Sequence, residues 1–262
     1  MRFFNSDNWQ ILKNNNEYLK HFASLGDVFL CRGESVVKDK HSEVIKFAGS
    51  DKVFYIKRYT ASRRKFLSLF RDSFISSEVE NLKRLKRIGL PVPTVIAYGE
   101  RWKGCRFIAG ALITEEVKNS TDLEQCLANH PELLNDKEWL NKVIDQVAVY
   151  THEMHSSGFV HRDLNLRNIL VQTQGSPAVH FIDCPSGGFR KSYLLMSGVI
   201  RDLAHMERTA RYLLSSRDLL RFYKKYKKVL KLTPKDKKLI SQIRHFHDRY
   251  RAKKSRKTDK FY

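Results

Sequence analysis

Residues 159–168 read FVHRDLNLRN, and the apolar run ILV follows at 169–171. A second apolar run, VHFID at 179–183, ends at Asp183. The pattern predicts two short strands in a hairpin, with Asp163 and Asn168 in the loop before the first strand and Asp183 at the end of the second. Strand geometry is expected to hold these two carboxylates and one amide together.

This set of groups is typical of phosphoryl transfer. That reaction needs a carboxylate near the attacking hydroxyl and oxygen ligands for a magnesium ion that bridges the phosphates. Asp163, Asn168 and Asp183 supply both. The reaction also needs a cation on the nucleotide phosphates, for which Lys57 in the predicted strand VFYIKRY is the candidate. Glu78, further along the chain, is expected to hold that lysine.

The first half of the chain predicts a small antiparallel sheet followed by a helix. Short β-type runs are GDVFL at 26–30, ESVVKD at 34–39, SEVIKFAG at 42–49 and KVFYIKRY at 52–59. Helical spacing then covers 75–88, and Gly89 and Pro91 end it. Two interpretations of its start are open: Ser77 begins a capping box with Glu80, or the helix begins near Asp72 or Ser73, as pairing of Glu78 with Lys57 requires.

The rest of the chain predicts two more strands, at 94–100 and 106–116, and then mainly helices. A helix at 119–130 is expected to be capped by Ser120 or Thr121. A long amphipathic helix over 139–157 ends at Gly158, and helical, increasingly basic sequence follows Val199. We therefore expect an α+β chain of two lobes, with an N-terminal lobe at 1–116, a C-terminal lobe at 117–247 and a basic, disordered tail at 248–262.

Composition restricts the partners. The formal net charge of +21 predicts attraction to polyanions, whether nucleic acid, an anionic membrane surface or a phosphorylated ligand. The cysteines have no CxxC spacing, so the sequence favours neither a zinc site nor a disulfide framework and fits reduced cytoplasmic thiols; they are Cys31, Cys105, Cys126 and Cys184. We expect no signal peptide and no membrane-spanning segment, so membrane contact is expected to be peripheral.

The ordered set of residues resembles the protein-kinase-like superfamily, whose bilobal fold has an antiparallel N-lobe sheet with one helix and a mostly helical C-lobe. The resemblance implies ATP and Mg²⁺ as cofactors, Lys57 on the phosphates with Glu78 as its partner, and Asp163 as the catalytic base. It implies Asn168 and Asp183 as magnesium ligands. It also implies nucleotide contacts from Glu115 and Val117 in LITEEV at 112–117.

Within that superfamily the chain most resembles the lipopolysaccharide-core kinases, the Kdo/heptose kinase group. The likeness rests on RRKFLSLFR at 63–71 before SEVENL, on GLPVPTVIAYGE at 89–100, on LITEEV, and on RDLAHMERTARYLLSSRDLLRFYKKY at 201–226. It implies phosphorylation of an inner-core sugar hydroxyl, heptose first and Kdo next, by a peripheral enzyme at the cytoplasmic face of the inner membrane. The expected partners are this glycolipid and an anionic membrane surface, rather than nucleic acid.

The sequence also departs from a conventional protein kinase. It has no GxGxxG motif, DCP replaces DFG at 183–185, and no APE segment follows. Two alternatives are open: an atypical protein kinase of the RIO-like kind, and a basic nucleic-acid-binding module on a kinase-like fold. RRKFLSLFR suits either membrane contact or packing on its lobe. We expect a structural role for His161, and two interpretations of Asp202 are open: a support for the catalytic loop backbone, or an ordinary helix cap or surface charge.

Overall fold

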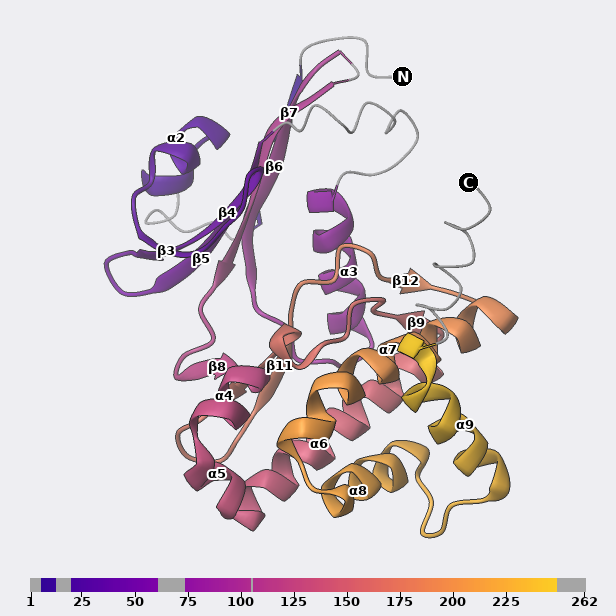
Figure 1. Cartoon of the computed structure of the whole chain (residues 1–262). Helices are drawn as coiled ribbons and strands as arrows, with labels where there is room; N and C mark the ends of the chain where they lie inside the picture. Colours follow the sequence, from indigo (N-terminus) through magenta and orange to yellow (C-terminus); the bar gives the residue numbers. More distant parts are fainter. Residues whose placement is uncertain (1–5, 13–19, 61–73, 105, 249–262) are drawn as a thin grey trace, which may run out of the picture. The chain divides into compact units, whose positions relative to one another are not determined.

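The computed structural model describes residues 6–12, 20–60, 74–104 and 106–248. The segment RRKFLSLFR, the basic tail and the helix start predicted at Asp72 or Ser73 lie outside these residues. The chain packs as two compact units (Figure 1): residues 1–83 with 93–117 form the first, and residues 84–92 with 118–262 form the second. No helix in the described part is long and apolar enough to cross a membrane.

The first unit is built on an antiparallel sheet. Its order is β1-β6-β7-β5-β4-β3, and β2 also pairs with β6. The strands predicted from the sequence are present except for GDVFL. The sheet consists of β1 (Ser6–Asp7), β2 (Gln10–Ile11), β3 (Glu34–Lys38), β4 (Ser42–Ala48), β5 (Val53–Thr60), β6 (Val95–Lys103) and β7 (Arg106–Glu115).

GDVFL is not a strand, so that prediction was wrong. It lies in helix α2 (Leu25–Leu30), whose N-cap Ser24 accepts a hydrogen bond from the Asp27 amide at 3.2 Å. The Ser24 hydroxyl also donates to the Asp27 carboxylate at 2.7 Å. At the other end of the helix, the Arg58 guanidinium donates to the carbonyls of Val28 and Cys31. Capping at both ends outweighs the β propensity of Val and Phe.

Helices cover both faces of this sheet. Leu25 and Val28 of α2 pack on one face, in a core with Ile56 of β5. Helix α3 (Phe74–Arg87) covers the other face, where Ile75 and Val79 pack against Leu112 of β7 (Figure 1). Side chains alternate along a strand, so Lys57, next to Ile56, points to the face that α3 covers.

The second unit is mainly helical, as predicted. Its helices are α4 (Leu123–Asn129), α5 (Pro131–Asn135), α6 (Lys137–Ser156), α7 (Ser192–Leu213), α8 (Ser216–Lys227) and α9 (Pro234–Arg244). The strands are β8 (Ser120–Asp122), β9 (Phe159–Val160), β10 (Ile169–Gln172), β11 (Val179–Phe181) and β12 (Gly188–Phe189). The cap of α4 is Asp122, which accepts from the Gln125 amide at 2.9 Å, so the predicted caps Ser120 and Thr121 were wrong. Those two residues pair with β10 instead.

A short segment from the middle of the chain completes the core of the second unit. Residues 84–92 contribute Leu85 and Leu90, which are buried among side chains of α4, α6 and α7. The carbonyl of Pro91 accepts a hydrogen bond from the Phe181 amide at 2.9 Å. This segment is therefore an integral part of the unit that contains β10 and β11.

Candidate active site

Lys57 and Glu78 form an ion pair within the first unit. The lysine Nζ lies 3.1 Å from Oε2 and 3.3 Å from Oε1 of Glu78. The glutamate side chain is only 5% exposed, so the pair lies largely out of solvent. Helix α3 runs continuously through Ser77, so the capping box at Ser77 was a wrong interpretation.

Glu115 and Val117 lie at the end of β7 and just after it. Glu115 pairs with Phe54 of β5, and its amide donates to the Thr94 carbonyl at 2.9 Å. Its carboxylate accepts from Lys52 Nζ at 2.6 Å. Glu115 therefore lies on β7, the strand that pairs with the strand of Lys57, β5, and Val117 is the last residue of this unit.

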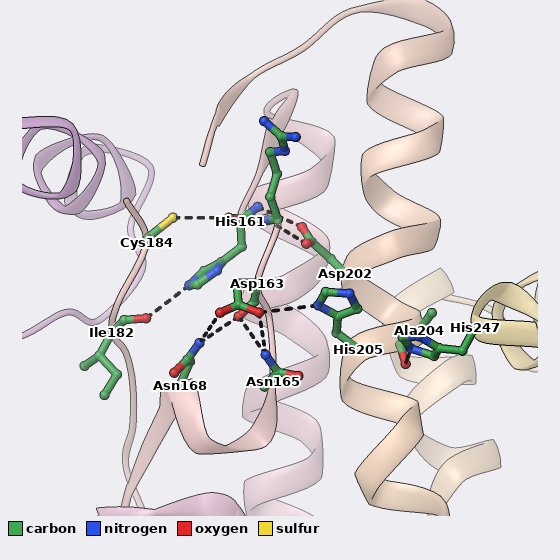
Figure 2. Close-up of polar contacts among 11 residues, drawn as sticks. His161, Asp163, Asn165, Asn168, Ile182, Cys184, Asp202, Ala204, His205 and His247 are labelled. Atoms are coloured by element: carbon green, nitrogen blue, oxygen red, sulfur yellow. Dashed lines mark hydrogen bonds and ion pairs between the residues drawn. The ribbon is translucent and has the colours of Figure 1, made fainter. Parts of the chain in front are cut away.

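Asp163 lies at the centre of a polar cluster in the second unit (Figure 2). Its Oδ1 accepts from Asn165 Nδ2 at 2.6 Å and lies 3.5 Å from Nδ1 of His205. The Asn168 side chain donates to the Asp163 carbonyl at 2.8 Å and approaches Oδ2 at 3.4 Å. Both asparagines are buried, whereas the Asp163 side chain is 44% exposed. The arrangement orients a carboxylate whose other side faces solvent.

Asp202 of α7 fixes the backbone of this loop. Its carboxylate is fully buried and accepts from the amides of His161 and Arg162, each at 2.7 Å. The oxygen that accepts from the His161 amide, Oδ2, also lies 3.3 Å from Nε2 of His155, and the other ring nitrogen of His155 lies 2.9 Å from the Tyr226 hydroxyl. Asp202 is therefore a support for the loop, as the first of the two interpretations predicted, and not a surface charge.

The loop that contains Asp183 is connected to the loop that contains Asp163. The Ile182 amide donates to the Asn168 carbonyl at 3.0 Å, and Nε2 of His161 lies 3.1 Å from the Ile182 carbonyl. His161 thus links two backbone segments, which is the structural role expected for it. Asp183 has a left-handed backbone, with φ of 57°. This conformation is strained for a residue with a Cβ atom and is common at functional sites.

The charge state of the cluster follows from these contacts. Contact with His205 and the hydrogen bond from Asn165 hold the pKa of the Asp163 carboxyl well below its usual range, at about 2, although partial burial opposes them. At 3.5 Å the His205 contact is an ion pair when that ring is protonated, rather than a full hydrogen bond. Burial lowers the pKa of His161. Asp163 is thus an ionised acceptor and His161 a neutral ring.

The donor set fits a magnesium ion that is bound together with a nucleotide. Magnesium in such sites takes one or two protein carboxylates, with phosphate oxygens and water as its other ligands. Asp183 offers a carboxylate. Asn168 uses its amide nitrogen on the Asp163 carbonyl, so its amide oxygen points away from that bond. Within the ranges described above, no group of three or more His, Cys, Asp or Glu residues is arranged to hold a metal.

Sequence reasoning missed two residues that contact Asp163. Asn165 is a polar residue between the apolar Leu164 and Leu166 in HRDLNLRN, and this position could have marked it as a candidate site residue. His205 follows Asp202 by three residues on α7, so helical spacing puts the two on one face. Its ring stacks on His247, with ring centroids 5.5 Å apart and an interplanar angle of 20°.

Known proteins share this sequence pattern and fold. A 3-deoxy-D-manno-octulosonic acid kinase of Vibrio vulnificus is 34% identical over 98 residues, 37% of this chain and 38% of that protein. The Actinobacillus succinogenes enzyme of the same name is 31% identical over 111 residues, 39% of this chain and 43% of its own length. The lipopolysaccharide core heptose(I) kinase WaaP of Pseudomonas aeruginosa is 28% identical over 96 residues, 37% of this chain and 36% of that protein.

These matches span less than half the length of each curated relative. A solved structure, WaaP in complex with acyl carrier protein, matches the fold with a TM-score of 0.65 at 20% identity, over 97% of this chain and 99% of that one. The expected α+β kinase-like fold is therefore confirmed. The sequence model of the lipopolysaccharide kinase (Kdo/WaaP) family matches residues 37–226, and the chain belongs to that family.

Proposed function

We propose that this protein is an ATP- and Mg²⁺-dependent kinase that phosphorylates a sugar hydroxyl of the lipopolysaccharide inner core. The observation that carries the proposal is the Asp163 carboxylate, held by Asn165 and Asn168 and partly open to solvent. Family membership supports the reaction class.

Asp163 accepts the proton of the attacking hydroxyl and orients that group toward the phosphorus atom. A carboxylate with a low pKa is a weak base, so its main contribution is orientation and charge, with proton transfer late in the reaction. Asn165 fixes one of its oxygens, and His205 acts as a positioning residue on the same oxygen. A general base of this kind contributes roughly 10²- to 10⁴-fold to the rate.

Lys57, held by Glu78, binds the phosphates of the nucleotide. Glu115 and Val117 contact the nucleobase. Asn168 and Asp183 would hold magnesium, which would neutralise the charge that develops on the phosphates. Asp202 keeps the loop of Asp163 in place through two backbone amides.

The acceptor is a Kdo or heptose residue of the inner core. The Kdo kinases among the relatives are up to 34% identical and the heptose kinase is 28% identical, so Kdo is the first acceptor to test, ahead of the heptose favoured by sequence analysis. Both sugars belong to an anionic glycolipid, which suits a chain of formal net charge +21. We place the protein at the cytoplasmic face of the inner membrane.

The test is transfer of labelled γ-phosphate from ATP to dephosphorylated core lipopolysaccharide, with Kdo-only and heptose-containing acceptors compared. Asp163→Asn, which keeps the side-chain shape, should lower transfer by on the order of 10² or more. Asp145→Asn is the matched control, because that carboxylate pairs with Arg221 on the surface and should leave transfer unchanged. One arm contains acyl carrier protein, because the solved WaaP is in complex with it. A native chain that phosphorylates protein but neither glycolipid would refute the proposed acceptor.

A further inference from the structure

The segment from β12 to the first turn of α7 exposes large apolar side chains. Phe189 is 48% exposed, Tyr193 79%, Leu194 63% and Met196 54%. Four of the twelve exposed large hydrophobic residues in the described part of the chain thus lie within eight consecutive positions. Isolated exposed apolar residues need no explanation, whereas a group of them along one short segment points to an interaction surface. We call these four residues the apolar patch.

The patch lies in a cationic stretch without acidic residues. From 184 to 201 the chain reads CPSGGFRKSYLLMSGVIR, with Arg190 and Lys191 next to the patch. The nearest carboxylates in sequence are Asp183 and Asp202, at the two ends of this stretch. Apolar and aromatic side chains flanked by cations are the composition that binds at the interface of an anionic bilayer.

The patch is attached firmly to the chain that leads into the Asp163 loop. Gly188 and Phe189 pair with Val160 and Phe159, the two residues before His161. The Phe189 ring meets the buried Phe159 ring edge to face, with centroids 5.4 Å apart. Figure 1 shows β12 and the beginning of α7 in orange, at the edge of the second unit. A surface bound here therefore has a fixed position relative to the loop.

We propose that the apolar patch, with Arg190 and Lys191, is the docking surface for the interface of an anionic lipid bilayer. Phe189, Leu194 and Met196 insert among the acyl chains near the headgroups, and Tyr193 keeps its hydroxyl in water. The two cations contact lipid phosphates. The inference deepens the proposed function, on which it depends for the acceptor, by naming the surface that meets the membrane holding this acceptor.

The test is sedimentation of the full chain with vesicles of phosphatidylcholine mixed with phosphatidylglycerol, compared with phosphatidylcholine alone. The double variant Leu194→Ser/Met196→Ser should bind the anionic vesicles at least tenfold more weakly. A tenfold loss corresponds to about 1.4 kcal/mol. Lys191→Gln should weaken binding about fivefold, since one cation near such a surface contributes roughly 1 kcal/mol.

The matched control is Tyr212→Ser/Leu230→Ser, which removes two large side chains outside the patch that are more exposed than Leu194 and Met196. It should bind like the native chain. Equal binding of the two double variants, or equal binding of the native chain to neutral vesicles, would overturn the proposal. A native dimer in sedimentation velocity that Leu194→Ser/Met196→Ser abolishes would overturn it as well, because a second copy would then cover the patch.

Vesicle binding needs neither ATP nor acceptor, so its outcome is independent of the kinase assay. If the native chain phosphorylates no core glycolipid while the patch variant still loses vesicle binding, the docking surface stands and the acceptor is wrong. If the native chain phosphorylates core glycolipid and the patch variant loses vesicle binding, the variant's activity on vesicle-bound lipopolysaccharide should fall relative to its activity on water-soluble core oligosaccharide.

Discussion

Replacement of Asp202 by alanine should destabilise the second unit far more than an ordinary surface change. The fully buried carboxylate accepts two backbone hydrogen bonds of 2.7 Å, from His161 and Arg162. Hydrogen bonds to a charged group contribute about 1.5–3 kcal/mol each, so loss of both costs about 3–6 kcal/mol. Domains are typically stable by only about 5–15 kcal/mol, so this is a large fraction of the total.

The assay is urea denaturation followed by the fluorescence of Trp139. This side chain is buried in the core of the second unit, whereas the other two tryptophans, Trp9 and Trp102, belong to the first. Replacement of both by phenylalanine in every variant makes the signal report on the second unit. With a denaturant slope of about 3 kcal/mol per molar, the expected loss moves the midpoint down by roughly 1–2 M.

Two further variants make the prediction specific. Asp145→Ala removes a carboxylate from the same unit that pairs with Arg221 at the surface, and such pairs contribute less than about 1 kcal/mol. Asp202→Asn retains one oxygen acceptor, so its midpoint should lie between those of the native chain and Asp202→Ala. If Asp202→Ala shifts the midpoint no more than Asp145→Ala does, the reasoning about loop support is refuted.

Three other changes have defined outcomes. His205→Phe removes the nitrogen 3.5 Å from the Asp163 carboxylate, so the pKa of Asp163, held at about 2, should rise toward its usual value in carboxyl ¹³C NMR titration. Because its pKa is lowered in the folded state, ionised Asp163 stabilises the fold above the usual aspartate pKa, and this stabilisation is lost as the pH falls toward 2. The His205→Phe variant should therefore lose less stability than the native chain between the usual aspartate pKa and pH 2. Lys57→Met should lower phosphoryl transfer on the order of 10²-fold, and unchanged kinetics would contradict the phosphate-binding role of Lys57. The variant also leaves the buried Glu78 carboxylate without Lys57, so its melting temperature should be lower. Gly187→Ala would place a Cβ atom in clash with the buried Sγ of Cys184, so it should lower the free energy of unfolding in urea by about 1–3 kcal/mol, and a native midpoint would contradict this packing.

The sequence predicted those parts of the fold that depend on local periodicity. The hairpin of β10 and β11 and the long helix α6 follow directly from apolar spacing and from Gly158 after the helix. The Lys57–Glu78 ion pair was expected from the order of a strand and a helix, and the structure contains it. The roles of these residues with a nucleotide stay proposals.

Other features depend on contacts that no local pattern reveals. His205 is more than forty residues from Asp163 in sequence and reaches it only because α7 packs beside the loop. The helix at 25–30 depends on Ser24 and on Arg58, which comes from a strand much later in the chain. β1 and β2 are two residues each and are defined only by pairing with β6. In each case a tertiary partner outweighs the local propensity.

The interleaved segment 84–92 affects the order in which the protein can fold during synthesis. Leu85 and Leu90 leave the ribosome well before α6 and β11, against which this part of the core is built. Pro91 precedes its hydrogen-bond partner Phe181 by 90 residues. At roughly 5–20 residues per second, that separation corresponds to about 5–20 s. Until α4 and α6 have also been synthesised, Leu85 and Leu90 lack these core partners, so residues 84–92 expose apolar surface in the nascent chain.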